Sequence, residues 1–232
     1  MSATLGRVEL ALFAVGFAIS GLVLLALLWS GDGAYVDMAR ANGITSASFI
    51  DHTTGATVEM GLGPLVQEHR VWSAYVTGGA LDPPEPGRFY TADEISHMAD
   101  VRRVFDGAKL LIPGGFFVMA IRLQRARSRS VEAMLRLVRD GAVAAGIAVA
   151  AVGIVAALAF EQAFLLFHEV FFPQGNFLFD PATSNLVRLY PDWYWQGVTF
   201  RIGLSFIALA AVAVVAASIG LRRGRSTRLA SA

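Results

Sequence analysis

The chain has 232 residues, of which 55% are hydrophobic, and its mean hydropathy is +0.55. Soluble domains contain roughly 45–50% apolar residues, so the composition excludes an ordinary soluble protein and indicates an integral membrane protein. The formal net charge is only +1, and the absence of cysteine excludes a thiol nucleophile, a disulfide framework and a cysteine metal site.

Four apolar blocks are each expected to span the membrane, because a hydrocarbon core of about 30 Å needs about 20 helical residues. The first block is longer than the apolar region of a signal peptide, so we interpret it as an uncleaved span. The second contains Pro113, Gly114 and Gly115 and is expected to kink or to be extended by an upstream helix. The sequence therefore predicts a mainly α membrane protein, a single integral membrane domain over residues 1–232, with spans at about 8–29, 107–123, 141–167 and 195–221.

Basic residues set the predicted orientation of these spans. Arg7 precedes the first span, six arginines lie in the linker 122–139, and four more lie in the C-terminal tail. The opposite loops, 31–106 and 168–194, hold 14 of the 18 acidic residues and only six arginines. Both termini are therefore expected in the cytoplasm and both loops outside it. We interpret the arginines as topological anchors attracted to anionic lipid and expect no nucleic-acid partner.

The first outer region, 31–106, is long enough for a small α+β cap. The segment "GAYVDMARANG" is typical of a short helix closed by Gly43, and "ITSASFIDHTTGATVEM" favours a hairpin. The segment "GPLVQEHRVWSAYVTGG" predicts a helix that begins near Pro64. His52 falls in the hairpin turn and His69 near an apolar stripe, so we interpret both as structural.

The stretch "FYTADEISHMADVRRVFDG" leads into the second span. Thr91 and Glu94 form a capping-box pattern that predicts a helix start. Asp93 lies four residues before His97 and Asp100 three after it, so both carboxylates can share a helical face with the imidazole. A neighbouring carboxylate can make a histidine a usable base or acid near neutral pH. A solvated helix with an incidental histidine would give the same pattern, so this stretch alone leaves both interpretations open.

A second histidine comes from the other outer loop. His168 lies seven residues after Glu161, about two helical turns, and at the C-terminal end of the third predicted span, where the helix dipole favours a protonated imidazole. Lys109 and Arg201 begin the second and fourth spans at the same level. Polar groups from three spans at one depth indicate a site. The alternatives are that Lys109 and Arg201 extend to the headgroups, or that Glu161 pairs with one of them structurally.

The stretches "YTADEISHMADVRRVF" and "FHEVFFPQGNFLFDPATSNLVRLYPDWYW", placed before the second span and between the third and fourth, resemble the bacterial lipoprotein intramolecular transacylase family, Lit. The resemblance implies an acyltransferase that moves the sn-2 acyl chain of a diacylglyceryl-cysteine lipoprotein to the cysteine α-amino group. It implies two functional histidines, which carry over to His97 and His168. It further implies a bacterial cell membrane location, an active site on the extracytoplasmic side, and diacylated lipoprotein and membrane lipid as partners. We infer no obligate protein partner.

On this basis we expect His97 to act as general base, oriented by Asp93 or Asp100. His168 as imidazolium would stabilise the oxyanion and protonate the leaving oxygen, and the two roles can be exchanged. The residues expected to support catalysis or bind substrate are Asp93, Asp100, Lys109, Glu161 and Arg201.

No cofactor, metal or covalent enzyme intermediate is required for this mechanism. Two other interpretations stay open: a metal-dependent membrane lipid hydrolase using His97, Asp100 and His168, and a non-catalytic membrane scaffold or accessory protein. A shared substrate centre requires the two histidines to lie within roughly 10 Å of each other.

Overall fold

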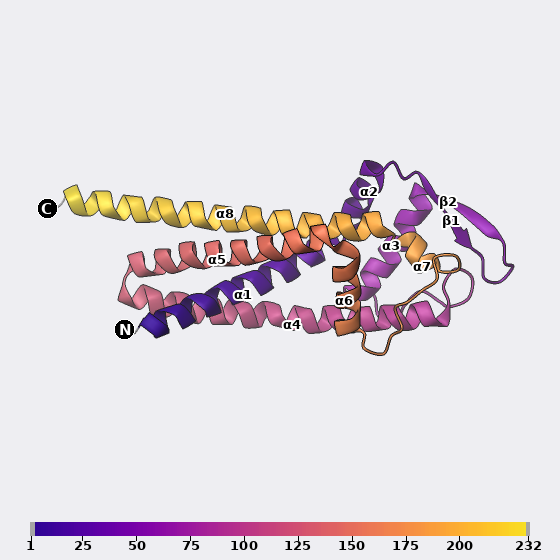
Figure 1. Ribbon diagram of the computed structural model, residues 1–232, viewed down its shortest axis with the longest axis horizontal. Coiled ribbons are helices and arrows are strands. Elements are labelled where there is room, and N and C mark those ends of the chain that lie inside the picture. The colour runs from indigo at the N-terminus through magenta and orange to yellow at the C-terminus, as the bar shows by residue number, and fades with distance from the viewer. Residues whose placement is uncertain (1–2, 231–232) are drawn as a thin grey trace. The chain divides into compact units, whose positions relative to one another are not determined.

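The computed structural model describes residues 3–230, which are mainly helical. The elements follow one another along the chain as coloured in Figure 1. In chain order they are α1 (Ala3–Trp29), α2 (Asp32–Ala41), β1 (Ser46–Ile50), β2 (Thr57–Gly61), α3 (Leu62–Val76), α4 (Ala92–Arg129), α5 (Val131–Leu158), α6 (Phe160–Phe171), α7 (Asn185–Leu189) and α8 (Asp192–Ala230).

Four helices of the described chain are long and apolar enough to cross a membrane, as the sequence predicts. Their candidate spans differ in extent from the expected blocks. In α4 the upstream helix runs without interruption through Pro113 into the second apolar block, so extension by an upstream helix is what occurs. The candidate spans are Gly6–Trp29, Ala92–Arg129, Val131–Leu158 and Asp192–Gly224.

The chain divides into two compact units. The first unit contains the described residues up to Leu25, Lys109–Ile154 and the described residues from Ile202 onward. Buried side chains of its helices form two clusters, one around Phe13, Met119, Ala126 and Leu137 and one around Ala14, Ala145, Phe206 and Ala210.

Small residues allow the helices of the first unit to approach one another. A Cβ on Gly141 would lie 2.3 Å from the Phe13 ring, and a Cβ on Gly115 would lie 2.2 Å from Ser20 Oγ. Larger side chains at these positions would force α1 away from α5 and α4. Membrane helices commonly pack through such small residues, since lipid tails give little hydrophobic drive for association.

The second unit contains Ala26–Ala108 and Val155–Arg201. The two helices and the hairpin expected in its first part are present as α2, α3 and the antiparallel pair β1–β2, in which Phe49 opposes Val58. Gly43 follows α2 at a φ of +69°, a value that L side chains rarely adopt, as its helix-ending role requires. The largest fully buried apolar and aromatic side chains of its core are Trp72, Tyr35, Phe49, Phe172, Met38, Leu65 and Leu189.

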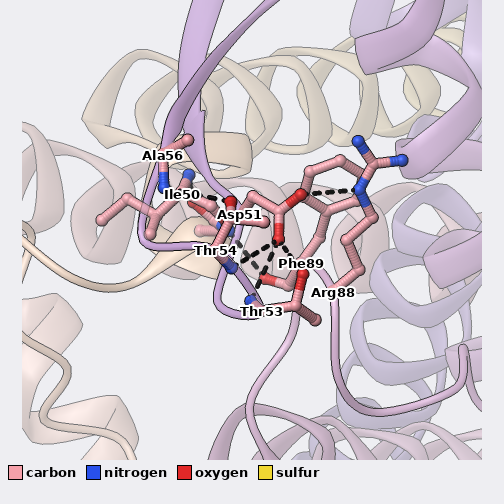
Figure 2. Close-up of polar contacts among 8 residues, drawn as sticks. Ile50, Asp51, Thr53, Thr54, Ala56, Arg88 and Phe89 are labelled. Carbon is pink, nitrogen blue, oxygen red and sulfur yellow. Dashed lines mark hydrogen bonds and ion pairs between the residues drawn. The ribbon is translucent and has the colours of Figure 1, made fainter.

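The hairpin turn is held by one carboxylate, as Figure 2 shows. Asp51 accepts hydrogen bonds from the backbone N–H groups of Thr53 (3.0 Å) and Thr54 (3.3 Å). Its other oxygen accepts from Arg88 Nε at 3.0 Å, and the His52 N–H donates to the Arg88 carbonyl at 2.8 Å. These bonds join the turn to the proline-rich segment that leads into α4.

The third predicted span ends earlier than its apolar pattern suggests. The helix expected over 141–167 stops at Leu158, Ala159 adopts a non-helical conformation (φ −140°, ψ 54°), and α6 begins at Phe160. Within the second unit Phe164 packs against Trp195 with ring centroids 5.5 Å apart. Such tertiary contacts outweigh local helical preference, and they place His168 on a separate short helix.

Candidate active site

The helix that carries the first histidine begins with a reciprocal cap. The Thr91 N–H donates to Glu94 Oε2 at 2.8 Å, and the Glu94 N–H donates to Thr91 Oγ1 at 3.2 Å. This is the capping box that the sequence predicts, and it satisfies two donors at the start of α4. His97 follows one turn later, so the cap fixes where its ring emerges.

Glu94 also binds α7, which the sequence does not reveal. Its Oε1 accepts from Ser184 Oγ at 2.6 Å and from the Leu186 N–H at 2.8 Å, and the Glu94 side chain is fully buried. Asn185 adds bonds from its side-chain amide to the carbonyls of Ile50 and Phe89, each at 2.7 Å. The start of α4, the hairpin and α7 are therefore joined by buried polar bonds, which are costly to break.

The two predicted histidines lie side by side. The ring centroids of His97 on α4 and His168 on α6 are 6.0 Å apart, and the ring planes differ by 23°. Both side chains are buried. This separation meets the expectation of roughly 10 Å or less, so one substrate centre can reach both rings.

Phenylalanine rings surround the histidine pair. His97 contacts Phe172 (centroids 4.8 Å apart) and Phe179 (5.6 Å) edge to face. His168 contacts Phe164 (4.2 Å) and Phe177 (5.2 Å). Three of these rings belong to the loop 172–184. Phenylalanine has no hydrogen-bonding group, so these four rings occupy none of the imidazole nitrogens, and the polar neighbour of His97 is the Asn176 side chain.

The His168 tautomer follows from one hydrogen bond. Its Nδ1 lies 2.8 Å from the Phe164 carbonyl oxygen, which can only accept, so Nδ1 carries the hydrogen. In the neutral ring Nε2 then holds the lone pair and can act as a base. Burial lowers the pKa of His168 below its ordinary value of 6.5, which opposes the protonated form expected from the helix C-terminus.

The His97 ring differs from the His168 ring in the hydrogen bonding of its Nδ1 atom. Its Nδ1 is buried and has no hydrogen-bond partner among the described residues. A buried polar atom without a partner is rare in folded proteins and costs free energy unless another group satisfies it. Here that atom belongs to a ring stacked near a second histidine, so a bound substrate is the natural source of a partner.

Asp100 is the one predicted carboxylate that is buried beside the histidines, and its partners differ from those expected. Its Oδ2 accepts from Gln174 Nε2 and from Asn176 Nδ2, both at 2.6 Å, and its Oδ1 pairs with Arg103. No hydrogen bond between Asp100 and His97 occurs among residues 3–230. Gln174 and Asn176 were not singled out by the sequence, because nothing local shows which carboxylate they reach.

The other predicted residues take separate positions. Asp93, in the first turn of α4, and Glu161, in the first turn of α6, are exposed. Arg201 is half-buried, and its guanidinium lies 5.7 Å from the centroid of the Trp29 ring in the second unit. Lys109 belongs to the first unit.

The remaining histidines have structural environments. His69 is buried, with Nδ1 3.2 Å from the Tyr190 hydroxyl and Nε2 3.1 Å from the Ser30 carbonyl oxygen. His52 lies in the hairpin turn, as predicted. Among the described residues, no group of three or more His, Asp or Glu side chains is arranged to hold a metal ion.

Comparisons with known proteins extend over most of the chain. A family model described as "Lipoprotein intramolecular transacylase Lit" matches residues 10–195. The solved structure of the membrane integral lipoprotein intramolecular transacylase Lit from Bacillus cereus is similar at 14% identity and a TM-score of 0.70, covering 97% of this chain and 100% of that chain. A histidine-to-arginine variant of that protein is similar at 14% identity and a TM-score of 0.67, covering 97% of this chain and 95% of that chain. No curated protein sequence matches the chain.

Proposed function

We propose, because the chain belongs to the lipoprotein intramolecular transacylase family Lit, that this multi-pass membrane acyltransferase moves the sn-2 acyl chain of a diacylglyceryl-cysteine lipoprotein to the cysteine α-amino group. The product is the lyso form of the lipoprotein. The observation that carries the site assignment is the stacked pair of buried imidazoles, His97 and His168, 6.0 Å apart. Donor ester and acceptor amine belong to one molecule, so binding them in a folded conformation gives a large effective molarity.

The histidine pair faces the extracytoplasmic side of the bacterial cell membrane in this proposal. The supporting observation is the charge distribution, with 14 of 18 acidic residues in the segments 31–106 and 168–194 and ten arginines in the linker 122–139 and the C-terminal tail. Both termini are then cytoplasmic, and the cap 31–106 and the loop 168–194 are extracytoplasmic.

In the first step the substrate amine attacks the carbonyl carbon of the sn-2 ester while His168 Nε2 accepts a proton from that amine. The supporting geometry is the Nδ1–H bond to the Phe164 carbonyl at 2.8 Å, which leaves Nε2 as the lone-pair nitrogen. The lowered pKa of His168, caused by burial, keeps this base neutral at physiological pH. This is the exchange of roles that the sequence left open.

In the second step the tetrahedral intermediate collapses. The bond between the acyl carbon and the sn-2 oxygen breaks, the amide bond remains, and the leaving oxygen takes a proton from His97, which has received it from protonated His168 beside it. The proton that left the amine has then passed through the two rings to the sn-2 oxygen, and both imidazoles are neutral again. No covalent enzyme intermediate is needed.

The remaining predicted residues have supporting roles. Arg201, which lies in the same unit as the histidine pair, is proposed to stabilise the oxyanion, since a cation near developing negative charge lowers the barrier, and Lys109 stays a predicted supporting residue. Asp93 and Glu161, which are exposed carboxylates, are proposed to contact the substrate.

The test measures conversion of a diacylated lipopeptide in detergent or lipid by mass spectrometry. The variant His168→Asn retains an N–H group in the position of Nδ1 but removes Nε2, so it separates loss of the base from loss of the fold. His97→Ala removes the second imidazole, and His52→Ala serves as the matched control. We expect the first two variants to lose about 10²–10⁴-fold in kcat and the control to retain activity. Near wild-type activity in either variant would overturn the assignment.

A further inference from the structure

The loop 172–184 between α6 and α7 supplies rings to both histidines, yet it has little regular structure of its own. Its backbone contacts include the Gly175 N–H to the Phe172 carbonyl at 2.9 Å and the Phe179 N–H to the Phe177 carbonyl at 3.2 Å. Leu178, between Phe177 and Phe179, is 76% exposed. Positioning of Phe172, Phe177 and Phe179 therefore depends on side-chain contacts from outside the loop.

Asp100 provides such a contact. Asp100 is only 8% exposed, and one oxygen of its carboxylate, Oδ2, accepts from both loop amides, Gln174 Nε2 and Asn176 Nδ2, at 2.6 Å each. Hydrogen bonds to a carboxylate are about twice as strong as neutral ones. We call these three residues, Asp100, Gln174 and Asn176, the Asp100 anchor.

A glycine permits the two amides to converge. Gly175, between Gln174 and Asn176, has a φ of +78°, a region that L side chains rarely adopt. The turn brings the two side chains together, and Gln174 Nε2 also lies 3.1 Å from Asn176 Oδ1. The loop is therefore shaped to present two donors to a single acceptor.

We propose that Asp100 is a positioning residue, which holds the loop 172–184 so that its phenylalanine rings enclose the histidine pair. Asp100 lies three residues after His97 on α4, so the helix that carries one histidine also fixes the loop that contacts both. This proposal rests on the catalytic role proposed above for His97 and His168. It differs from the sequence expectation that Asp100 orients the His97 ring directly.

The physical reason is the sensitivity of an intramolecular reaction to geometry. The amine and the ester must meet within about 3–3.5 Å, and a displacement of about 1 Å can cost about 10²-fold in rate. Loss of the Asp100 anchor leaves the histidines in place but frees the rings that confine the substrate beside them.

The chain contains no cysteine, so a single introduced thiol can report on the loop. Leu178→Cys, labelled with a nitroxide, provides the spectroscopic probe in the full-length protein. The anchor is removed from the helix side by Asp100→Ala and disrupted from the loop side by Gln174→Ala, which leaves Asn176, the polar neighbour of His97, in place. Two matched controls change charges on the same helix: Arg103→Ala removes the exposed partner of Asp100, and Asp106→Ala removes a surface carboxylate.

We expect both anchor variants to increase nitroxide mobility and to lower kcat by roughly 10- to 100-fold, with the acid limb of the pH–rate profile unmoved. The controls should leave mobility and kcat within about twofold, since exposed ion pairs contribute little. If Asp100→Ala alone moved the acid limb and the loop-side variant kept full activity, Asp100 would act directly on His97 and the proposal would fail. Unchanged label mobility in both anchor variants would also overturn it.

The spectroscopic arm separates this proposal from the proposed function. If the wild-type protein fails to convert the lipopeptide, the function assignment fails, but label mobility still shows whether Asp100 holds the loop. If the histidine variants abolish activity while the anchor variants retain it, the function stands and the positioning role is wrong.

Discussion

The second unit contains two groups of buried histidine, and their surroundings differ in one chemical respect. His69 lies among tyrosines: its ring stacks on Tyr35 with centroids 4.5 Å apart and contacts Tyr190 and Tyr194 edge to face. Both of its nitrogens have partners, the Tyr190 hydroxyl and the Ser30 carbonyl. Every polar atom of this imidazole is used within the fold.

His97 and His168 lie instead among phenylalanines, which bury the rings without hydrogen-bonding them. His97 Nδ1 has no partner among the described residues, and only Nδ1 of His168 is committed, to the Phe164 carbonyl. Burial alone does not distinguish a structural histidine from a reactive one. The distinction lies in whether neighbouring groups satisfy the ring nitrogens, since an unsatisfied buried nitrogen is tolerated where a ligand supplies the missing bond.

The largest effect that we expect for this comparison is the loss of folding stability at low pH that His69 causes. Burial lowers its pKa from 6.5 to about 4, so between these pH values the unfolded chain binds a proton that the folded chain does not. The stability from the neutral ring is complete above pH 6.5 and is lost as pH falls to 4, by about 3 kcal/mol. His69→Gln retains a hydrogen-bonding side chain that does not titrate and should flatten this dependence.

Thermal unfolding in detergent between pH 4 and 7 measures this effect. The matched variant His52→Gln, in the hairpin turn, should retain the wild-type slope. An unchanged slope in the His69→Gln variant would mean that another group controls acid stability and that His69 is not the buried neutral ring described here.

Much of the second unit could be predicted from local patterns. The capping box of Thr91 and Glu94, the helix ending at Gly43 and the hairpin each depend on residues only a few positions apart, and all are present. The proximity of His97 and His168 followed from their common predicted depth and from the family resemblance. Local chemistry and membrane topology were sufficient for these features.

Contacts between distant segments could not be predicted in the same way. The bonds from Gln174 and Asn176 to Asp100 join residues separated by 74 and 76 positions, and they depend on the path of an irregular loop. The helix break at Ala159 could not be predicted locally, since that position is neither proline nor glycine. We attribute the break to the packing of α6 within the second unit, where Phe164 contacts Trp195. The capping pattern likewise predicted that Glu94 caps its own helix, but it did not predict the buried hydrogen bonds of Glu94 with Ser184 and Leu186.

A second, smaller effect concerns the reactive pair. The pKa of His168 is lowered by burial, and a general base works only when unprotonated. The acid limb of the kcat/KM profile should therefore have its midpoint below 6.5, with a tenfold loss of activity for each further pH unit. Steady-state rates on the lipopeptide at pH 5 to 8 (roughly the range over which histidine titrates), with folding checked at each pH, measure it. A midpoint above 6.5 would indicate that His168 works as the protonated partner, as first expected from its position at a helix C-terminus.

The smallest effect isolates a single hydroxyl. Tyr190→Phe removes the hydroxyl donor that lies 3.2 Å from His69 Nδ1. It leaves a phenylalanine ring against His69, as in the surroundings of His97 and His168. One buried hydrogen bond contributes about 1 kcal/mol, so the melting temperature should fall by about 2–4 °C while kcat is unchanged. A stable variant with reduced kcat would place Tyr190 in the chemistry and remove the basis for the comparison. We expect lower stability with intact activity. That result would show that a ring nitrogen without a hydrogen-bond partner destabilises the fold at a position where no substrate binds.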